Sequence, residues 1–186
     1  MAVKKVLRIG NPLLRTRCRS ITEFDTSELH TLIQDMRDTM QAEQGAGLAA
    51  IQIGIPLRLV IFSVDANPRY PEAEPIPETV LINPVIEPVG TGMETDWEGC
   101  LSVPGLRGLV PRYQTIRYTG TDQYGQPIAT TASGFHARVV QHEVDHLDGI
   151  LYVERMQDMK SFGFVEELAA AGVFERQCIP CETSGE

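Results

Sequence analysis

The sequence has no long apolar run and no excess of positive charge. The apolar strip at residues 59–62 is far too short to cross a bilayer, and the first ten residues carry charges rather than a signal peptide's apolar segment. The formal net charge of −9 and the pI of about 4.9 argue against broad binding to nucleic-acid phosphates, which needs a basic face. We therefore expect a cytoplasmic protein with no membrane and no direct nucleic-acid partner.

Cysteine is also scarce, with single residues at positions 18 and 100 and a pair at 178 and 181. A disulfide framework is not expected in a chain of this size without a secretion signal. The Cys178-Ile-Pro-Cys181 pair lacks the two neighbouring ligands that a zinc knuckle needs. We predict one domain over residues 1–175 and a flexible C-terminal tail over 176–186.

What the chain does contain is a mixture of helical and strand patterns. An apolar period of 3.6 residues predicts a helix from Thr26 or Ser27 to about residue 42. The four prolines of 67–77 predict an exposed loop, and Pro84 is expected to break the strand that contains it. Strands are expected at 57–64, 80–87, 115–121 and 128–131. This order predicts an α+β fold, mostly antiparallel sheets wrapped around one central helix.

That central helix is predicted from residue 135 up to Gly149, a candidate C-terminal cap. It contains the hexapeptide Gln-His-Glu-Val-Asp-His at 141–146, an H-E-x-x-H pattern. In a helix, His142 and His146 lie on one face, where both imidazoles can bind one metal ion and Glu143 lies beside it. The alternative is an amphipathic helix with two surface histidines.

A catalytic metal site usually needs a third protein ligand. His136 is rotated away from the other two histidines, and Glu154 follows the break at Gly149. Cys100, beside a glycine and ahead of a proline, is the remaining candidate. Its alternative is a buried core cysteine, which is common for this residue type.

The glycine-rich stretch 45–54 is not a phosphate-binding loop, because it lacks the G-x-x-x-x-G-K-[ST] pattern. Its two closely spaced glycines indicate either a backbone wall beside a bound peptide or a plain tight turn.

Three stretches together resemble the peptide deformylase family. Residues 45–52 are similar to its G-x-G-L-A-A-x-Q pattern, 98–102 to its E-G-C-L-S, and 141–146 to its Q-H-E-x-D-H, in the family's order. The likeness extends from about residue 6 to 156. The segments 104–107 and 134–138 further resemble the branch that includes organelle-type enzymes.

The resemblance implies a metal-dependent hydrolase that removes the N-formyl group from the formylmethionine of newly made polypeptides. Metal-bound hydroxide would attack the formyl carbon, with Glu143 as general base and acid. The implied ligands of one divalent ion per chain are Cys100, His142 and His146. Fe²⁺ is the expected native ion, and Zn²⁺, Ni²⁺ or Co²⁺ also suit this ligand set.

The resemblance also assigns supporting roles. Gln52 and the Leu101 N–H would stabilise the oxyanion. Gly47 would offer its backbone to the substrate, Ala46 would line the methionine pocket, and Arg107 would lie at the substrate rim. The other residues with an implied role are Glu98 and Asp145, which would orient the histidines or, alternatively, form surface ion pairs.

Some features depart from the familiar bacterial pattern. Ala46 stands where a larger aliphatic often lines the pocket, and Arg138 occupies a position that can be apolar. Glu166 and Glu167 make the end of the chain acidic, so ribosome docking through it is not expected, although a transient association stays open. The competing functions are another metallohydrolase, such as a peptidase, and a structural module with a closed four-ligand site.

Overall fold

The computed structural model of the protein describes residues 2–65 and 74–174. The helices, 3-10 helices and strands of the described residues are, in chain order, η1 Pro12–Arg15, α1 Ser27–Ala42, β1 Gly47–Ala49, η2 Ala50–Ile53, β2 Leu59–Val64, β3 Ile76–Pro88, β4 Met93–Cys100, β5 Val103–Tyr113, β6 Thr115–Thr121, β7 Pro127–Ser133, α2 Gly134–Leu147, η3 Tyr152–Glu154, η4 Met159–Ser161, β8 Gly163–Phe164 and α3 Val165–Ala170.

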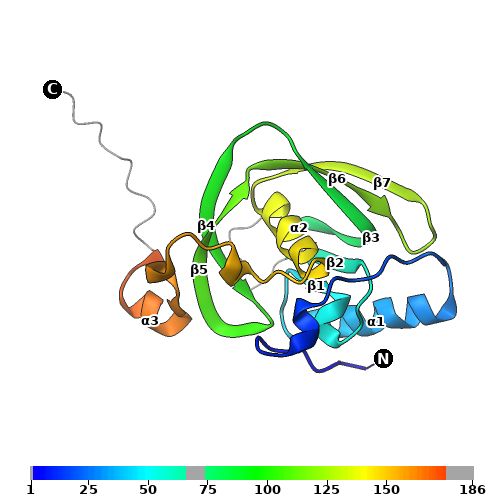
Figure 1. The fold of residues 1–186 in the computed structure, drawn as a ribbon, viewed down its shortest axis with the longest axis horizontal. Helices are drawn as coiled ribbons and strands as arrows, with labels where there is room; N and C mark the ends of the chain where they lie inside the picture. The colour runs from blue at the N-terminus through cyan, green and yellow to red at the C-terminus, as the bar shows by residue number, and fades with distance from the viewer. Residues whose placement is uncertain (1, 66–73, 175–186) are drawn as a thin grey trace.

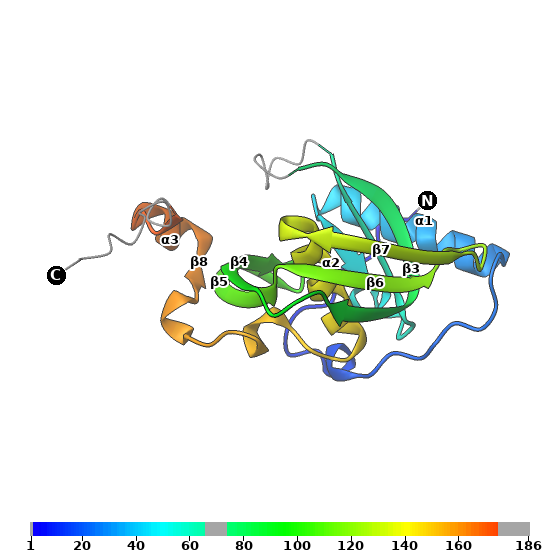
Figure 2. The same ribbon diagram turned by 90° about the horizontal axis from the view of Figure 1, so that it is seen from above.

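Two antiparallel sheets surround α2. The larger has the strand order β1-β2-β3-β6-β7, and the smaller has the order β4-β5-β8. The helix lies between β6 and β7 on one side and β4 and β5 on the other, and α1 lies outside the larger sheet (Figures 1 and 2). This arrangement confirms the predicted α+β class with antiparallel sheets around one helix.

The early helix α1 forms as its sequence predicts. The Thr26 side chain accepts a hydrogen bond from the Leu29 N–H, which satisfies one of the free amides of the first turn. The buried side chains Leu29, Ile33, Met36 and Met40 recur at helical spacing and pack on the larger sheet, as expected.

Apolar side chains in the described residues form separate clusters, and α2 belongs to only one of them. Its residues Ala137, Val140 and Leu147 pack with the larger sheet. The smaller sheet has a cluster of its own, built from Cys100, Val103, Val110, Leu151 and Tyr152. The site described below lies where these two regions meet.

Several sequence-based expectations need revision. The hairpin of β4 and β5 was not predicted, although it carries Cys100. Strand β3 continues through Pro84 instead of breaking, because its register shifts between Ile82 and Val85 and Asn83 adopts φ 51°. The predicted loop 67–77 ends earlier than expected, since β3 begins at Ile76, and most of that loop lies outside the described residues.

The boundary predicted at 175/176 and the tail with Cys178 and Cys181 lie outside the described residues. Within 2–65 and 74–174, no helix has the length and apolar character needed to span a membrane.

Candidate metal centre

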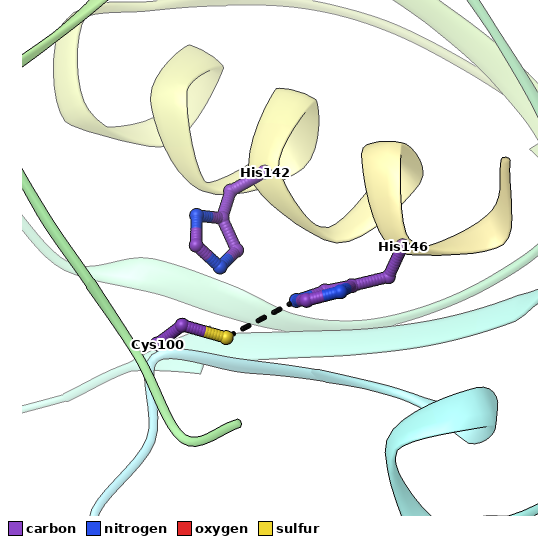
Figure 3. A group of neighbouring side chains, drawn as sticks. All are labelled: Cys100, His142 and His146. Carbon is purple, nitrogen blue, oxygen red and sulfur yellow. Dashed lines mark hydrogen bonds between the residues drawn. The ribbon is translucent and has the colours of Figure 1, made fainter. Parts of the chain in front are cut away.

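The two histidines of the H-E-x-x-H pattern face the end of β4. Helix α2 starts directly after β7 and stops before Gly149, whose φ of 76° is the left-handed conformation that glycine adopts readily. His142 and His146 therefore lie one turn apart, and β4 delivers Cys100 opposite them (Figure 3). One ligating atom from each of the three residues lies within 4.8 Å of the other two, and all three side chains are buried.

The donor set suits a transition-metal cation. Cys100 Sγ lies 3.3 Å from His146 Nε2, and the Nδ1 atom of His146 has no hydrogen-bond partner among the described residues. Burial keeps the pKa of His146 well below its ordinary value, so the ring is neutral and free to ligate. A thiolate with two imidazoles is a typical ligand set for such ions, and these three residues fit one.

His142 is oriented by a buried carboxylate. Its Nδ1 lies 2.8 Å from Glu98 Oε2, which directs the other ring nitrogen toward Cys100. Burial opposes protonation of His142, but Cys100 and Glu98 outweigh it and raise the pKa of the ring well above its ordinary value. A cation bound to Cys100, His142 and His146 would take the place of the proton on the ring nitrogen of His142 that faces Cys100.

Glu98 itself bonds to two arginines. Arg112 donates to both carboxylate oxygens at 2.8 and 3.0 Å, and Arg138 Nη1 donates to Oε1 at 2.9 Å. Burial opposes ionisation, yet hydrogen bonds from His142 and Arg112 overcome it and lower the pKa of Glu98 far below its ordinary value. The predicted contact of Glu98 with a metal-site histidine is present.

The prediction that Asp145 orients a metal-site histidine is wrong. Its carboxylate binds Arg112 and Arg155 rather than either histidine. Asp145 precedes His146 by one residue, so the helix turns its side chain about 100° away from the histidine face. It therefore acts on His142 only indirectly, through Arg112 and Glu98.

Glu143 lies beside the ligand set with its carboxylate incompletely bonded. Its Oε2 is buried without a hydrogen-bond partner among the described residues, and burial raises the pKa of Glu143 to about 7. A carboxylate with this pKa can both take and release a proton near neutral pH. Gly47 packs directly against this side chain.

Gln52 lies on the other side of Cys100. Its carbonyl oxygen accepts from the Ala49 N–H at 2.8 Å, and this bond turns Nε2 toward the site. Nε2 lies 3.2 Å from Ser102 Oγ and 3.5 Å from Cys100 Sγ. An uncharged donor is therefore fixed next to the proposed ligands.

A cavity of about 50 Å³ opens beside these groups, which is room for a small chemical group and water but not for a larger molecule. Ala46, Gly47, Gln52 and Leu101 line it together with Glu143, as expected for a binding site. Arg107 is not among its lining residues; it pairs across the β4–β5 hairpin with Gly99, which is.

Two contributors to this site were not predicted from the sequence. Arg112 carries no local signal of this role; it lies on β5 opposite Glu94, and its guanidinium reaches Glu98 on the paired strand. Tyr152 stacks on His142 with ring centroids 6.0 Å apart and donates to the Leu106 carbonyl. No local pattern marks Tyr152, because it follows the helix and reaches the site only in the folded chain. His136 contacts Tyr118 instead of the ligands, as expected.

Comparison with known proteins agrees with this geometry. The sequence model of the family described as polypeptide deformylase matches residues 3–162. Peptide deformylase 1 of Nitrosomonas europaea is 57% identical over 166 residues, which cover 89% of this chain and 94% of the relative. Peptide deformylase 1 of Prochlorococcus marinus is 52% identical over 177 residues, covering 95% and 92% of the two chains.

Among solved structures, the Met-Ala-Ser-bound class I type b peptide deformylase of Acinetobacter baumannii is similar, with a TM-score of 0.81 and 38% identity. The match covers 83% of this chain and 99% of that one. Sequence and fold match those of these proteins over most of the chain, and the three buried ligands lie within the matched residues. This chain therefore belongs to the polypeptide deformylase family.

Proposed function

We propose that this protein hydrolyses the N-formyl group of peptides that begin with formylmethionine, releasing formate and a free amino terminus. The observation that carries this proposal is the convergence of Cys100, His142 and His146 within 4.8 Å, next to the carboxylate of Glu143. The resulting site has three protein ligands, and the usual catalytic site of this kind leaves its remaining position for water or substrate.

A divalent cation held by these three residues would make water acidic and polarise a carbonyl oxygen. Glu143 supplies the proton transfers. Its carboxylate accepts a proton from the water that adds to the formyl carbon, and then gives that proton to the amine nitrogen as the carbon–nitrogen bond breaks. Burial raises the pKa of Glu143, which favours its taking that proton.

Negative charge develops on the formyl oxygen as water adds. We assign its stabilisation to the Nε2 amide of Gln52 and the backbone N–H of Leu101. The bond from the Ala49 N–H fixes the Gln52 amide in advance, so little reorganisation is needed during the reaction. A donor of this kind typically contributes about 3 kcal/mol to lowering the barrier.

The substrate peptide is proposed to bind along β1. Among the described residues this strand is at the edge of the larger sheet and pairs with β2 alone, so its other edge can accept an added strand. Gly47 would present its backbone there, and Ala46 would border the methionine side chain. The Acinetobacter relative binds Met-Ala-Ser, the sequence expected of a deformylated product, which supports a peptide that begins with methionine as the ligand. Arg107 is proposed as an outer contact of the peptide.

Fe²⁺ is the ion proposed for the native protein. One thiolate and two imidazoles also suit Zn²⁺, Ni²⁺ and Co²⁺, so availability in the cell governs which ion is bound. A cytoplasmic location, a single domain over 1–175 with a flexible tail, and membership of the branch that includes organelle-type enzymes stay predictions. The acidic helix α3, with Glu166 and Glu167 in its first turn, gives no support to ribosome docking through this end.

A paired assay tests the activity. Formyl-Met-Ala should be deformylated, while acetyl-Met-Ala and internal peptide bonds should stay intact. Cleavage of internal bonds without deformylation would indicate a peptidase instead. A tightly bound metal without any hydrolysis would indicate a structural module.

A further inference from the structure

The candidate metal centre joins two parts of the fold that share no apolar cluster. The histidines come from α2, whose apolar residues pack with the larger sheet. Cys100 belongs to the cluster of the smaller sheet, which contains no residue of α2. Tyr152 of that cluster stacks on His142, and the other contacts between these two parts described below are polar.

A buried arginine on α2 bridges this junction. Arg138 is 4% exposed and lies one turn before His142 on the same side of the helix. Its Nη1 donates to Glu98 Oε1 at 2.9 Å and to the Val110 carbonyl at 2.8 Å. Its Nη2 donates to the Glu94 carbonyl at 2.8 Å.

These acceptors lie on both strands of the β4–β5 hairpin, whose first strand ends at Cys100. Glu94 and Glu98 belong to β4, and Val110 belongs to β5. A guanidinium can serve several acceptors at once in a fixed plane, which an ammonium cannot. The buried Arg138 guanidinium also forms an ion pair with Glu98, the carboxylate that orients His142.

On the premise of the metal site in the proposed function, we propose that Arg138 is a positioning residue. It locks the β4–β5 hairpin to α2 and so sets the spacing between Cys100 and the two histidines. Gln141 makes another such link, since its amide bonds to both the N–H and the carbonyl of Tyr113, and Arg112 of β5 makes a further one to Asp145 of α2. Tyr113 and Arg112 lie at the end of β5 away from Cys100, so these links hold the hairpin at the other end from the sulfur.

The test measures Co²⁺ affinity and the sulfur-to-cobalt absorption band in the full chain. Arg138→Leu and Arg138→Lys are compared with the wild type, with Arg37→Met as the matched control. Arg37 on α1 pairs with Glu78 on β3, and neither residue lines the cavity at the metal centre, so this variant removes an arginine ion pair without touching the bridge. Thermal unfolding of the metal-free proteins reports whether each variant is folded.

We expect Arg138→Leu to bind Co²⁺ at least about tenfold more weakly, with a weakened or shifted sulfur band, and Arg138→Lys to recover part of both. Arg37→Met should change neither. Affinity within about twofold of the wild type, or weaker binding with an unchanged sulfur band, would overturn the positioning role. If the leucine variant does not fold, the lysine variant decides by the same criteria. A wild-type protein that binds no Co²⁺ would overturn the proposed function itself, together with this inference.

Discussion

Gly47 lies against Glu143 so closely that a Cβ on the glycine would stand 2.6 Å from both Cγ and Oε1 of the glutamate. Nothing as large as a methyl group fits there without moving the side chain proposed to carry the proton. Glycine at this position is therefore a requirement of the site, in addition to any contact with a substrate backbone.

Gly47→Ala should consequently displace Glu143 and lower kcat by roughly a hundredfold, the effect of a shift of about 1 Å in a reacting group. Metal content should not change, since the ligands are untouched. Gly92→Ala is a matched control because its Cβ would also meet an atom at 2.6 Å, but that atom is the end of the exposed Gln114 side chain, which can move. Equal losses in the two variants would refute the specific role of the Gly47 contact.

Removing the proton carrier while keeping its shape separates chemistry from metal binding. Glu143→Gln should retain the metal ion but lose nearly all turnover, because a carboxamide cannot accept the proton of water. Metal analysis and formyl-Met-Ala turnover on the same sample check both parts. A variant that stays active, or one that loses its metal, would contradict the role given to Glu143.

Replacing the sulfur ligand tests the ligand set directly. Cys100→Ser should weaken metal affinity by more than the roughly 10- to 100-fold typical of losing an outer hydrogen bond to a ligand. Thiolate is the softest donor present, and a serine hydroxyl stays protonated. Competition with a chelator measures the affinity; an unchanged value would remove Cys100 from the coordination sphere.

The buried carboxylate Glu98 provides a prediction about stability. Glu98→Gln leaves Arg138 buried without its counter-ion and Arg112 with Asp145 alone, which should cost about 3–5 kcal/mol of unfolding free energy. Urea unfolding of the metal-free protein measures this cost separately from metal binding.

Glu78→Gln is the control for this change, because the Glu78–Arg37 pair is partly exposed and should contribute less than about 1 kcal/mol. Similar losses for the two variants would show that the Glu98 cluster carries no special weight.

The parts of this site that local sequence determines were predictable. The four-residue spacing of His142 and His146 and the stop at Gly149 are properties of one helix, so periodicity reveals them. The residues around Cys100 left two interpretations open, a metal ligand or a buried core cysteine. Its role as a ligand followed from the family resemblance.

The parts that depend on pairing between distant segments were not predictable. Residues 93–113 contain several glycines, prolines and charges, so their pattern does not resemble the long strands β4 and β5 that they form. The bridge from Arg138 to Glu98 and the contact between Arg112 and Glu98 depend on that hairpin. Asp145 was misassigned because its partners, Arg112 on β5 and Arg155 beyond the helix, come from segments that meet it only in the folded chain.

The most direct test of the account measures metal content and formyl-Met-Ala turnover in one anaerobic preparation, before and after removal of the ion and its replacement. We predict one divalent ion per chain, turnover that falls in proportion to the metal removed, and recovery when Fe²⁺ is restored. Full turnover in metal-free protein would contradict the central claim that Cys100, His142 and His146 hold the ion on which deformylation depends.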